Sequence, residues 1–245
     1  MTDATHSRRL LRGVAAVCTA ITALAFAGWA HAATINVSTT TQLQQVIGTP
    51  TTPGTAAAGD TVVVAPGAYA PDAPLTVTVD NLTVIGSQTA NTRINGSNVA
   101  SINGAPPDMF DVFGNGFTLQ NFALQQTANN GTVIDVFGLN ATLSNSSVSA
   151  NNGLVLHSEV GATFKLVNST ISSNQDAALI ADGNFDLINT TIADNAGSGI
   201  ANNGGGVVNL TNSIVSHNGL TIPNAHDCDQ PISVAGGGSS ITRIS

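Results

Sequence analysis

Two aspartates, Asp111 and Asp135, occupy the same place in two copies of one short phrase. The phrases read Phe-Asp-Val-Phe-Gly and Ile-Asp-Val-Phe-Gly, and 24 residues separate the two aspartates. Along an extended strand, successive side chains alternate between opposite faces, so the apolar neighbours point one way and both carboxylates the other. On adjacent parallel strands the two carboxylates lie about 5 Å apart. At that distance they either share a proton, with one pKa raised, or hold a cation such as Ca²⁺.

A following unit carries two more side chains of the same kind. His157 and Glu159 stand where they could extend the file of aspartates and complete a ligand or metal site with Asp111 and Asp135. In an enzyme, the two aspartates would act together with Arg93 as the catalytic residues. The alternative also stays open, in which the acids are solvated neighbours on an exposed sheet face.

A phrase of the form Asn-Ser/Thr-x-Ile-x-x-Asn recurs through the second half of the chain and sets the frame for these residues. Steps of 24, 23, 21 and 23 residues separate its leading asparagines. A period in the twenties predicts a solenoid of stacked units, each of which buries its apolar face against its neighbours. The leading positions are Asn121, Asn145, Asn168, Asn189 and Asn212, and the closing ones are Asn151, Asn174, Asn195 and Asn218.

Each unit contains three short stretches of alternating apolar residues. One precedes the leading asparagine, as in Phe164-Lys-Leu166, one follows it around a residue such as Ile171, and one precedes the next unit, as in Leu154-Val-Leu156. Three short strands per unit predict a three-faced parallel β-helix. The asparagines should lie at its corners, where asparagine tolerates left-handed backbone and where stacked amides can form hydrogen-bonded ladders.

These units resemble those of bacterial right-handed parallel β-helix proteins of the pectate-lyase-like superfamily, in particular secreted surface or adhesin-type proteins with the same phrase. The stretch from Ala58 to Tyr69, with its Gly-Asp-Thr and Pro-Gly-Ala-Tyr, is similar to the opening of that group. The resemblance covers roughly Thr34 to Ile241. It implies an all-β fold: a single-stranded right-handed β-helix of about eight coils with a short N-terminal capping helix. Lyases, esterases, epimerases and adhesins share this fold, so the resemblance implies no single activity.

The chain divides into an export segment and one domain. Residues 1–32 read as a signal peptide, with three arginines, an apolar stretch and Ala-His-Ala before the expected cleavage point. Residues 33–245 form the β-helix: cap and loop at 33–59, coils at 60–235 and a tail at 236–245. Thr39-x-x-Gln42 has capping-box spacing for the cap helix. A longer step before Asn121 predicts a loop within 94–108.

The net charge and the cysteine content limit the classes of molecule that the protein can bind. Loss of residues 1–32 removes three basic residues and one acidic residue, which takes the formal net charge from −8 to −10. That charge argues against nucleic-acid and anionic-membrane partners. The remaining cysteine, Cys228, cannot form a disulfide within the domain, and we expect His226 to Asp229 to be an exposed turn. The sequence predicts an exported monomer, located extracellularly, on the cell surface or in a periplasm, without a membrane span.

Basic residues are too few for the chemistry that the resemblance offers. Polysaccharide lyases of this fold combine Ca²⁺-binding acids with an Arg or Lys base, and only Arg93 and Lys165 lie within the coils. We expect Lys165 to pair with Asp186, and most phenylalanines to point inward, away from any sugar. The sequence therefore favours a non-catalytic binding or structural module for a polysaccharide or a host or cell-surface ligand, with no cofactor apart from Ca²⁺ at the acids. The alternative is a carbohydrate-active enzyme, a lyase or epimerase acting on acidic polysaccharide.

Overall fold

The computed structural model describes the β-helix and leaves most of the predicted signal peptide outside the described residues. Residues from Ala32 onward form one compact unit. Among the described residues no helix has the length and apolar character needed to cross a membrane. The described residues are 31–87, 91–101, 107–127, 131–202, 205–219, 225–228, 233–234 and 239–241.

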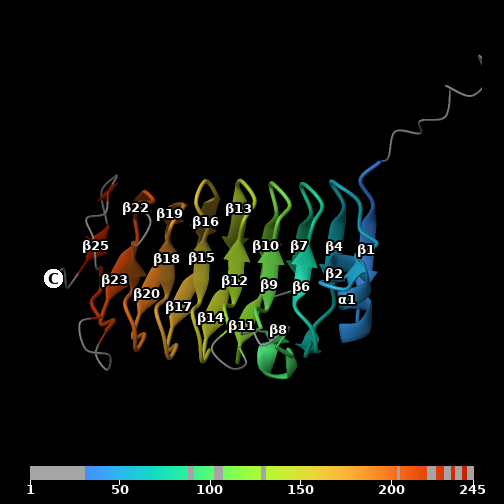
Figure 1. Cartoon of the computed structure of the whole chain (residues 1–245), viewed down its shortest axis with the longest axis horizontal. Helices are drawn as coiled ribbons and strands as arrows, with labels where there is room; N and C mark the ends of the chain where they lie inside the picture. Colours follow the sequence, from blue (N-terminus) through green and yellow to red (C-terminus); the bar gives the residue numbers. More distant parts are fainter. Residues whose placement is uncertain are drawn as a thin grey trace, which may run out of the picture. The chain divides into compact units, whose positions relative to one another are not determined.

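Three parallel sheets run the length of the domain, and successive coils add one strand to each (Figure 1). The nine-stranded sheet consists of β1 (Thr34–Val37), β4 (Thr61–Val64), β7 (Thr83–Gly86), β10 (Thr118–Gln120), β13 (Ala141–Ser144), β16 (Thr163–Val167), β19 (Asn184–Ile188), β22 (Val208–Thr211) and β24 (Ser233–Val234). The eight-stranded sheet consists of β5 (Gly67–Tyr69), β8 (Thr92–Asn95), β11 (Ala123–Gln125), β14 (Ser147–Ser149), β17 (Thr170–Ser172), β20 (Thr191–Ala193), β23 (Ile214–Ser216) and β25 (Ser240–Ile241). The six-stranded sheet consists of β6 (Leu75–Val77), β9 (Phe110–Val112), β12 (Ile134–Val136), β15 (Leu156–Ser158), β18 (Leu179–Ala181) and β21 (Ile200–Ala201).

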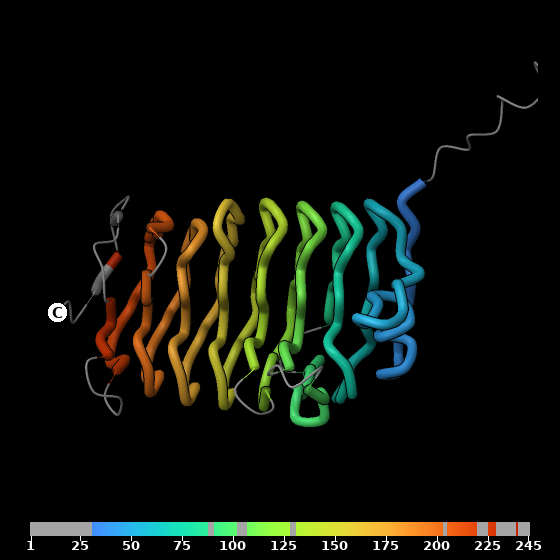
Figure 2. Tube along the Cα trace, in the orientation of Figure 1, coloured from blue at the N-terminus to red at the C-terminus, as the bar shows by residue number. Residues whose placement is uncertain are grey.

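The chain winds through these sheets in about seven turns, compared with about eight expected. Figure 2 shows the turns succeeding one another along the axis, from the first strands to the last. Two segments differ from the sequence-based boundaries. Ser240–Ile241, expected in a tail, pairs with β23, and β8 together with the short 3₁₀ helix Gly96–Asn98 occupies the start of the expected loop, while residues 102–106 of that loop lie outside the described residues.

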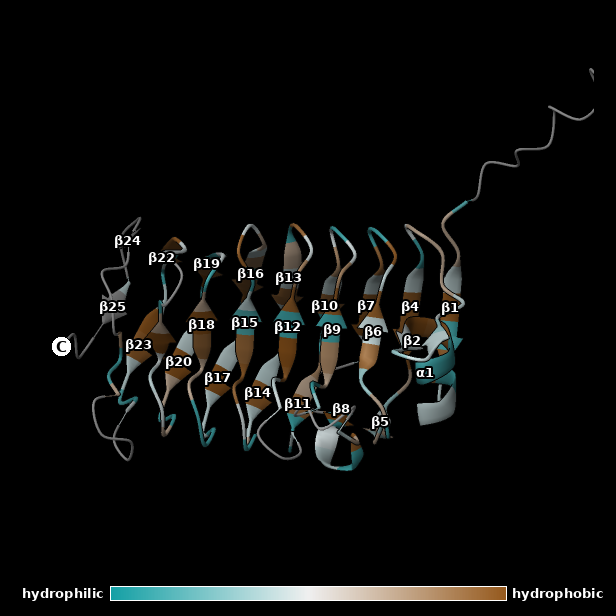
Figure 3. Cartoon of the chain, in the orientation of Figure 1, coloured by the Kyte–Doolittle hydropathy of each residue, from teal (hydrophilic) through white to brown (hydrophobic). Residues whose placement is uncertain are grey.

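The interior is a stack of identical apolar positions. The leucines of the Phe-x-Leu triplets are fully buried one above another, as Leu119, Leu143, Leu166, Leu187 and Leu210 show. Full burial of one such side chain contributes about 1.5–3 kcal/mol. Hydrophobic residues colour the strands brown in Figure 3, and a hydrophilic band crosses β12 and β15 on the six-stranded sheet. That band is where the alternation turns polar residues outward.

The N-terminal end is closed by helix α1 (Thr40–Ile47), as the capping-box spacing predicted. The Thr39 side chain accepts a hydrogen bond from the Gln42 backbone N–H (3.2 Å), and Gln42 Oε1 accepts one from the Ser38 N–H (2.9 Å). The helix buries Leu43, Val46 and Ile47. Beyond it, β2 (Gly48–Thr49) and β3 (Thr52–Pro53) form a small antiparallel pair.

Two files of asparagine mark the corners before and after the eight-stranded sheet. The leading asparagines have left-handed backbone, with φ from 48° to 66°, and the exposed amide of Asn189 donates to Asn168 and accepts from Asn212. The closing asparagines are buried instead, and the left-handed residue of that corner is the one before each of them, such as Asp194. Their amides bond both to one another and to backbone carbonyls; Asn195, for example, donates to Asn218 Oδ1 (2.8 Å) and to Ile171 O (3.3 Å).

Candidate functional site

The two aspartates of the repeated phrase lie side by side on the outer face of the six-stranded sheet. Asp111 on β9 is in register with Asp135 on β12, and Asp135 is in register with His157 on β15. The flanking residues Phe110 and Val112 are buried, which turns the aspartate of that strand outward. The sheet therefore carries an outward file of Asp111, Asp135 and His157 along the solenoid axis.

His157 is the centre of the polar contacts in this file. Its Nδ1 lies 3.1 Å from Asp135 Oδ1 and 3.7 Å from Glu159 Oε1, and its Nε2 lies 3.3 Å from Asp182 Oδ2. The side-chain contact with Asp135 raises the pKa of His157 to about 9, against the opposing effect of burial. At neutral pH the imidazole is therefore protonated when nothing else binds to it, and it lies among the carboxylates of Asp135, Glu159 and Asp182.

The pKa of Asp111 is higher than that of an exposed carboxyl group. Burial, followed by repulsion from Asp108 and Asp135, raises the pKa of Asp111 to about 7. Asp108 accepts a hydrogen bond from the Thr132 N–H (2.6 Å), and burial raises its pKa as well. The structure thus brings the four predicted residues Asp111, Asp135, His157 and Glu159 onto one face. It adds Asp108 and Asp182, which lie outside the repeated phrase.

A second outward file runs beside the first, two residues further along each strand. It begins with Phe113 and Phe137, whose rings stack with centroids 4.6 Å apart and planes inclined by 14°. These rings are 49 % and 42 % exposed. Ladder hydrogen bonds from Phe137 N to Val112 O and from Glu159 N to Val136 O continue this file to Glu159. Most phenylalanines of the coils are buried, as expected, and this pair is the exception. A residue two positions after an outward aspartate also faces outward.

The basic residues considered for catalysis lie on the other two sheets. Arg93 is on β8 of the eight-stranded sheet, opposite Ala68 and Ala123. Lys165 is on β16 of the nine-stranded sheet, and its register partner there is Asp186. The expected ion pair between Lys165 and Asp186 is not formed: every ion pair among the described residues involves His157, and Asp186 Oδ1 accepts a hydrogen bond from Asn209 (2.9 Å).

The predicted exposed turn at the C-terminal end is also different in the structure. Asp227 and Cys228 are 0 % and 1 % exposed, and Cys228 forms a parallel bridge with Ile200. Asp227 Oδ1 accepts hydrogen bonds from the backbone N–H and the side-chain amide of Asn218 (2.7 and 2.9 Å). The segment therefore closes the buried asparagine ladder, which explains why an acidic residue lies inside.

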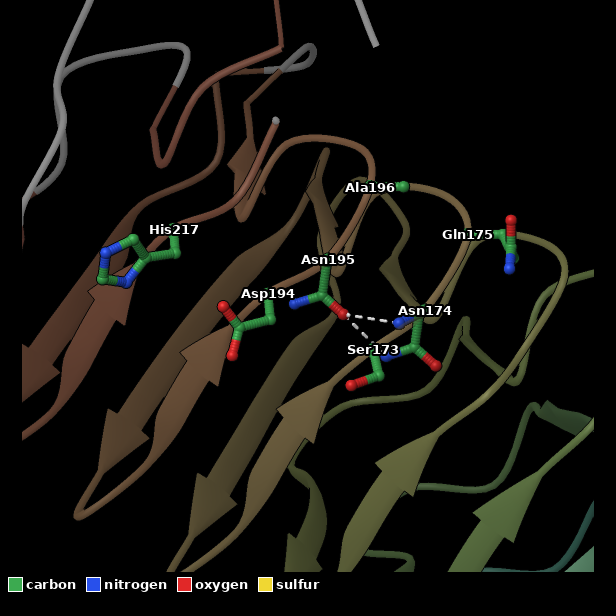
Figure 4. A pocket seen from close by; sticks show the side chains of 7 residues that line it. All are labelled: Ser173, Asn174, Gln175, Asp194, Asn195, Ala196 and His217. Carbon is green, nitrogen blue, oxygen red and sulfur yellow. Dashed lines mark hydrogen bonds between the residues drawn. The ribbon is translucent and has the colours of Figure 1, made fainter. Parts of the chain in front are cut away.

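A separate hollow of about 320 Å³ lies at the corner that follows the eight-stranded sheet. Figure 4 shows Ser173, Asp194 and His217 along one side of it, with Asn195 bonded to Asn174 behind them. The first three are the left-handed, exposed residues before successive ladder asparagines. The hollow is thus a product of the corner geometry, and it contains none of the residues of the acid and histidine file.

The family whose description reads "Right handed beta helix region" matches residues 69–243 of this sequence. The chain belongs to the right-handed β-helix family. This membership accords with the three parallel sheets and with the superfamily that the repeat phrases resembled. The sequence matches no curated protein.

Solved structures of other β-helix proteins share the fold at low sequence identity. The crystal structure of pectate lyase Pel9A has a TM-score of 0.59 at 14 % identity, over 88 % of this chain and 63 % of that one. The chain therefore spans less than two thirds of the length of this lyase. A rhamnogalacturonan lyase (TM-score 0.48, 12 % identity, 74 % and 67 % covered) and the A-module of the Azotobacter vinelandii mannuronan C-5 epimerase AlgE4 (0.40, 14 %, 75 % and 67 %) are more distant. At these identities the likeness establishes the fold and no activity.

Proposed function

We propose that this β-helix protein is an extracellular or cell-surface module that binds polysaccharide on the outer face of its six-stranded sheet without cleaving it. The observation that carries the proposal is the exposed stack of Phe113 and Phe137 directly beside the file of Asp111, Asp135 and His157. Apolar ring surface next to convergent polar groups is the usual composition of a carbohydrate-binding surface.

Exposed apolar surface is concentrated along this edge of the sheet. Six large hydrophobic side chains are exposed among the described residues. Four of them lie in the segments that directly follow β9, β12 and β15, namely Phe113, Phe137, Leu139 and Val160. Because apolar surface that gathers in one place marks a ligand or partner surface, the edge supports binding of an extended ligand.

The charge of the face limits which polysaccharide fits. The face carries the carboxyl groups of Asp108, Asp111, Asp135, Glu159 and Asp182 and a single histidine, and the two basic residues of the described coils lie on other sheets. A polyuronate would be repelled by these carboxylates in the absence of a bridging cation, whereas the hydroxyl groups of a neutral glycan can donate hydrogen bonds to them. We therefore propose a neutral polysaccharide as the ligand.

Affinity electrophoresis in gels containing neutral or acidic polysaccharides tests this proposal. We expect a neutral polysaccharide to retard the wild-type protein, and Phe113→Ala and Phe137→Ala each to weaken binding about tenfold, equivalent to about 1.4 kcal/mol. Ile214→Ala is the matched control, because Ile214 is 44 % exposed on the eight-stranded sheet. Absence of retardation by any neutral polysaccharide, or equal retardation of all four proteins, contradicts the proposal.

A carbohydrate-active enzyme is the second candidate, and the register of Asp111 with Asp135 favours it. Two carboxylates in neighbouring coils could serve as general acid and general base on either side of one bond. Release of reducing ends or unsaturated ends by the wild type, abolished in Asp111→Asn, would select this candidate over the binding module.

A further inference from the structure

We infer that Asp135, His157 and Glu159 form a three-ligand site for a divalent transition-metal ion of the zinc class. Each residue offers one ligand atom, and these atoms lie within 4.8 Å of one another. They come from two adjacent coils, with Asp135 on β12 and the other two residues on and directly after β15. The inference does not depend on the proposed polysaccharide binding.

The spacing of the ligand atoms suits tetrahedral coordination. Zinc binds imidazole nitrogen and carboxylate oxygen at about 2.0–2.2 Å, which places neighbouring ligands of a tetrahedron ~3.4 Å apart. The separations of His157 Nδ1 from Asp135 Oδ1 and Glu159 Oε1 are 3.1 and 3.7 Å. The third separation, between carboxylate oxygens of Asp135 and Glu159, is at most 4.8 Å, so one ion can contact all three atoms after side-chain shifts of up to about 1 Å.

The state of Asp135 is a second observation that points to a ligand. Asp135 is 8 % exposed, and its Oδ1 is shielded from solvent without a hydrogen-bond partner among the described residues. The imidazole of His157 is the ion-pair partner of this oxygen, with Nδ1 at 3.1 Å, but the contact does not have the geometry of a hydrogen bond. A metal ion bound between Nδ1 and Oδ1 would displace the imidazole proton and supply the positive charge in its place.

Asp182 supplies the outer partner that histidine ligands of metal ions usually have. Its Oδ2 lies 3.3 Å from His157 Nε2, on the side of the ring away from Nδ1. A carboxylate that accepts the proton of one ring nitrogen fixes the tautomer and leaves the other nitrogen free to ligate. Asp182 is therefore a positioning residue for Nδ1.

The donor set favours a zinc-class ion over Ca²⁺. Calcium takes six to eight oxygen ligands, whereas this site offers one nitrogen and two carboxylates. Three protein ligands also leave a fourth position free, and the side chain of Glu159 is 37 % exposed, so solvent reaches the site from that ligand. A water molecule or a ligand hydroxyl group can complete the coordination there.

Titration of chelator-treated, metal-free full-length protein with CoCl₂ tests the site, because tetrahedral Co²⁺ gives intense visible d–d absorption. We expect one Co²⁺ per chain, displaced by equimolar ZnCl₂ and not by equimolar CaCl₂. His157→Gln and Glu159→Gln should abolish the spectrum, and Asp182→Asn should weaken Co²⁺ binding about 10–100-fold, as loss of an outer partner typically does. Circular dichroism verifies that each variant is folded, and the half-exposed Glu159 provides a variant that should not disturb the core.

Two variants serve as controls. His217→Gln removes an exposed histidine beside the eight-stranded sheet, and Asp186→Asn removes a carboxylate from the nine-stranded sheet. Both should bind Co²⁺ like the wild type. Absence of a stoichiometric Co²⁺ spectrum in the wild type, its persistence in Glu159→Gln, or its loss in His217→Gln would overturn the site. Displacement of Co²⁺ by equimolar CaCl₂ would overturn the choice of ion.

Discussion

Asp227 is the last hydrogen-bond acceptor of the buried amide ladder, and Asn218 is the donor that bonds to it. Both the backbone N–H and the side-chain amide of Asn218 donate to Oδ1 of Asp227, at 2.7 and 2.9 Å. In the preceding coils the same two donors of Asn174 and Asn195 meet the carboxamide oxygen of the next asparagine. Asp227 therefore takes the place of the next asparagine where the repeat itself has stopped.

Replacement of Asp227 by Ala should destabilise the C-terminal coils. It leaves the backbone N–H of fully buried Asn218 without an acceptor, at a cost of about 1–3 kcal/mol, while the side-chain amide keeps the Ile192 and Ser216 carbonyls. Asp227→Asn should cost less, because the carboxamide keeps an acceptor oxygen in the same place. Urea unfolding measures both free energies, and equal values for Asp227→Ala and Asp227→Asn would show that the carboxyl oxygen does not terminate the ladder.

The two asparagine ladders should differ in their contribution to stability. Asn195→Leu removes a fully buried amide that bonds to Asn218 and to the Ile171 and Ala193 carbonyls, so we expect a loss of about 1–3 kcal/mol or more. Asn189→Leu removes an exposed amide whose partners can bond to water instead, so the loss should be smaller.

The same urea titrations measure this difference, with exposed Lys165→Leu as the reference for a surface substitution. A loss in Asn189→Leu as large as that in Asn195→Leu would mean that the exposed ladder, and not the buried one, holds the coils together.

The repeat made most of the fold predictable. Equivalent residues recur at the same position in every repeat. Aligning the repeats therefore predicts the corners, the inward leucines and the pairing of Asp111 with Asp135. The cap helix followed from local capping chemistry in the same way. Features that depend only on the periodic unit, or on a few adjacent residues, can therefore be predicted from such a sequence.

The rest of the candidate site depends on residues outside the shared phrase. Asp182 reaches His157 from the next coil, where it follows Ala181, the register partner of Ser158, and so takes the position of Glu159 one coil on. Its spacing of 23 residues from Glu159 was available in the sequence, but neither residue belongs to the repeated phrase. Asp108 precedes its strand, and Asp227 lies nine residues after Asn218, where the phrase is not repeated. The outward direction of Phe113 was available from its spacing to Asp111, but the buried phenylalanines of the Phe-x-Leu triplets suggested the opposite.

Asp60 should make the stability of the N-terminal coil depend on acid pH. This buried side chain accepts hydrogen bonds from the Ala33 and Ala57 N–H groups (2.7 and 2.8 Å), and these bonds hold its pKa below the ordinary value of 3.8. Because the pKa is lowered in the folded state, the stabilisation is complete above the unfolded value and is lost as pH falls through the folded value.

The comparison of wild type with Asp60→Asn checks this dependence. At neutral pH the variant should melt at a lower temperature, since its carboxamide offers one acceptor oxygen in place of two. Below the folded pKa of Asp60 the two melting temperatures should converge. Exposed Asp194→Asn is the control, and a difference between wild type and Asp60→Asn that does not change with pH would contradict the assignment.

The protein should not release unsaturated products from pectate, pectin or alginate, with or without Ca²⁺. A lyase needs a base that removes a proton from the sugar, and the two basic residues of the described coils, Arg93 and Lys165, lie on the sheets that do not carry Asp111 and Asp135. The acid-rich face also repels polyuronates. Absorbance of the unsaturated product, followed against a buffer blank, measures the activity.

Two variants make that measurement decisive. Asp111→Asn removes a carboxylate from the file, and Arg93→Gln removes the basic residue of the eight-stranded sheet, which the structure places away from the candidate site. If the wild type releases product, abolition by Asp111→Asn with full activity in Arg93→Gln would place catalysis on the six-stranded sheet and replace the binding module by the enzyme. If product release persists in Asp111→Asn, the activity does not arise from the file of Asp111, Asp135 and His157, because a reaction there requires the carboxylate that the variant lacks.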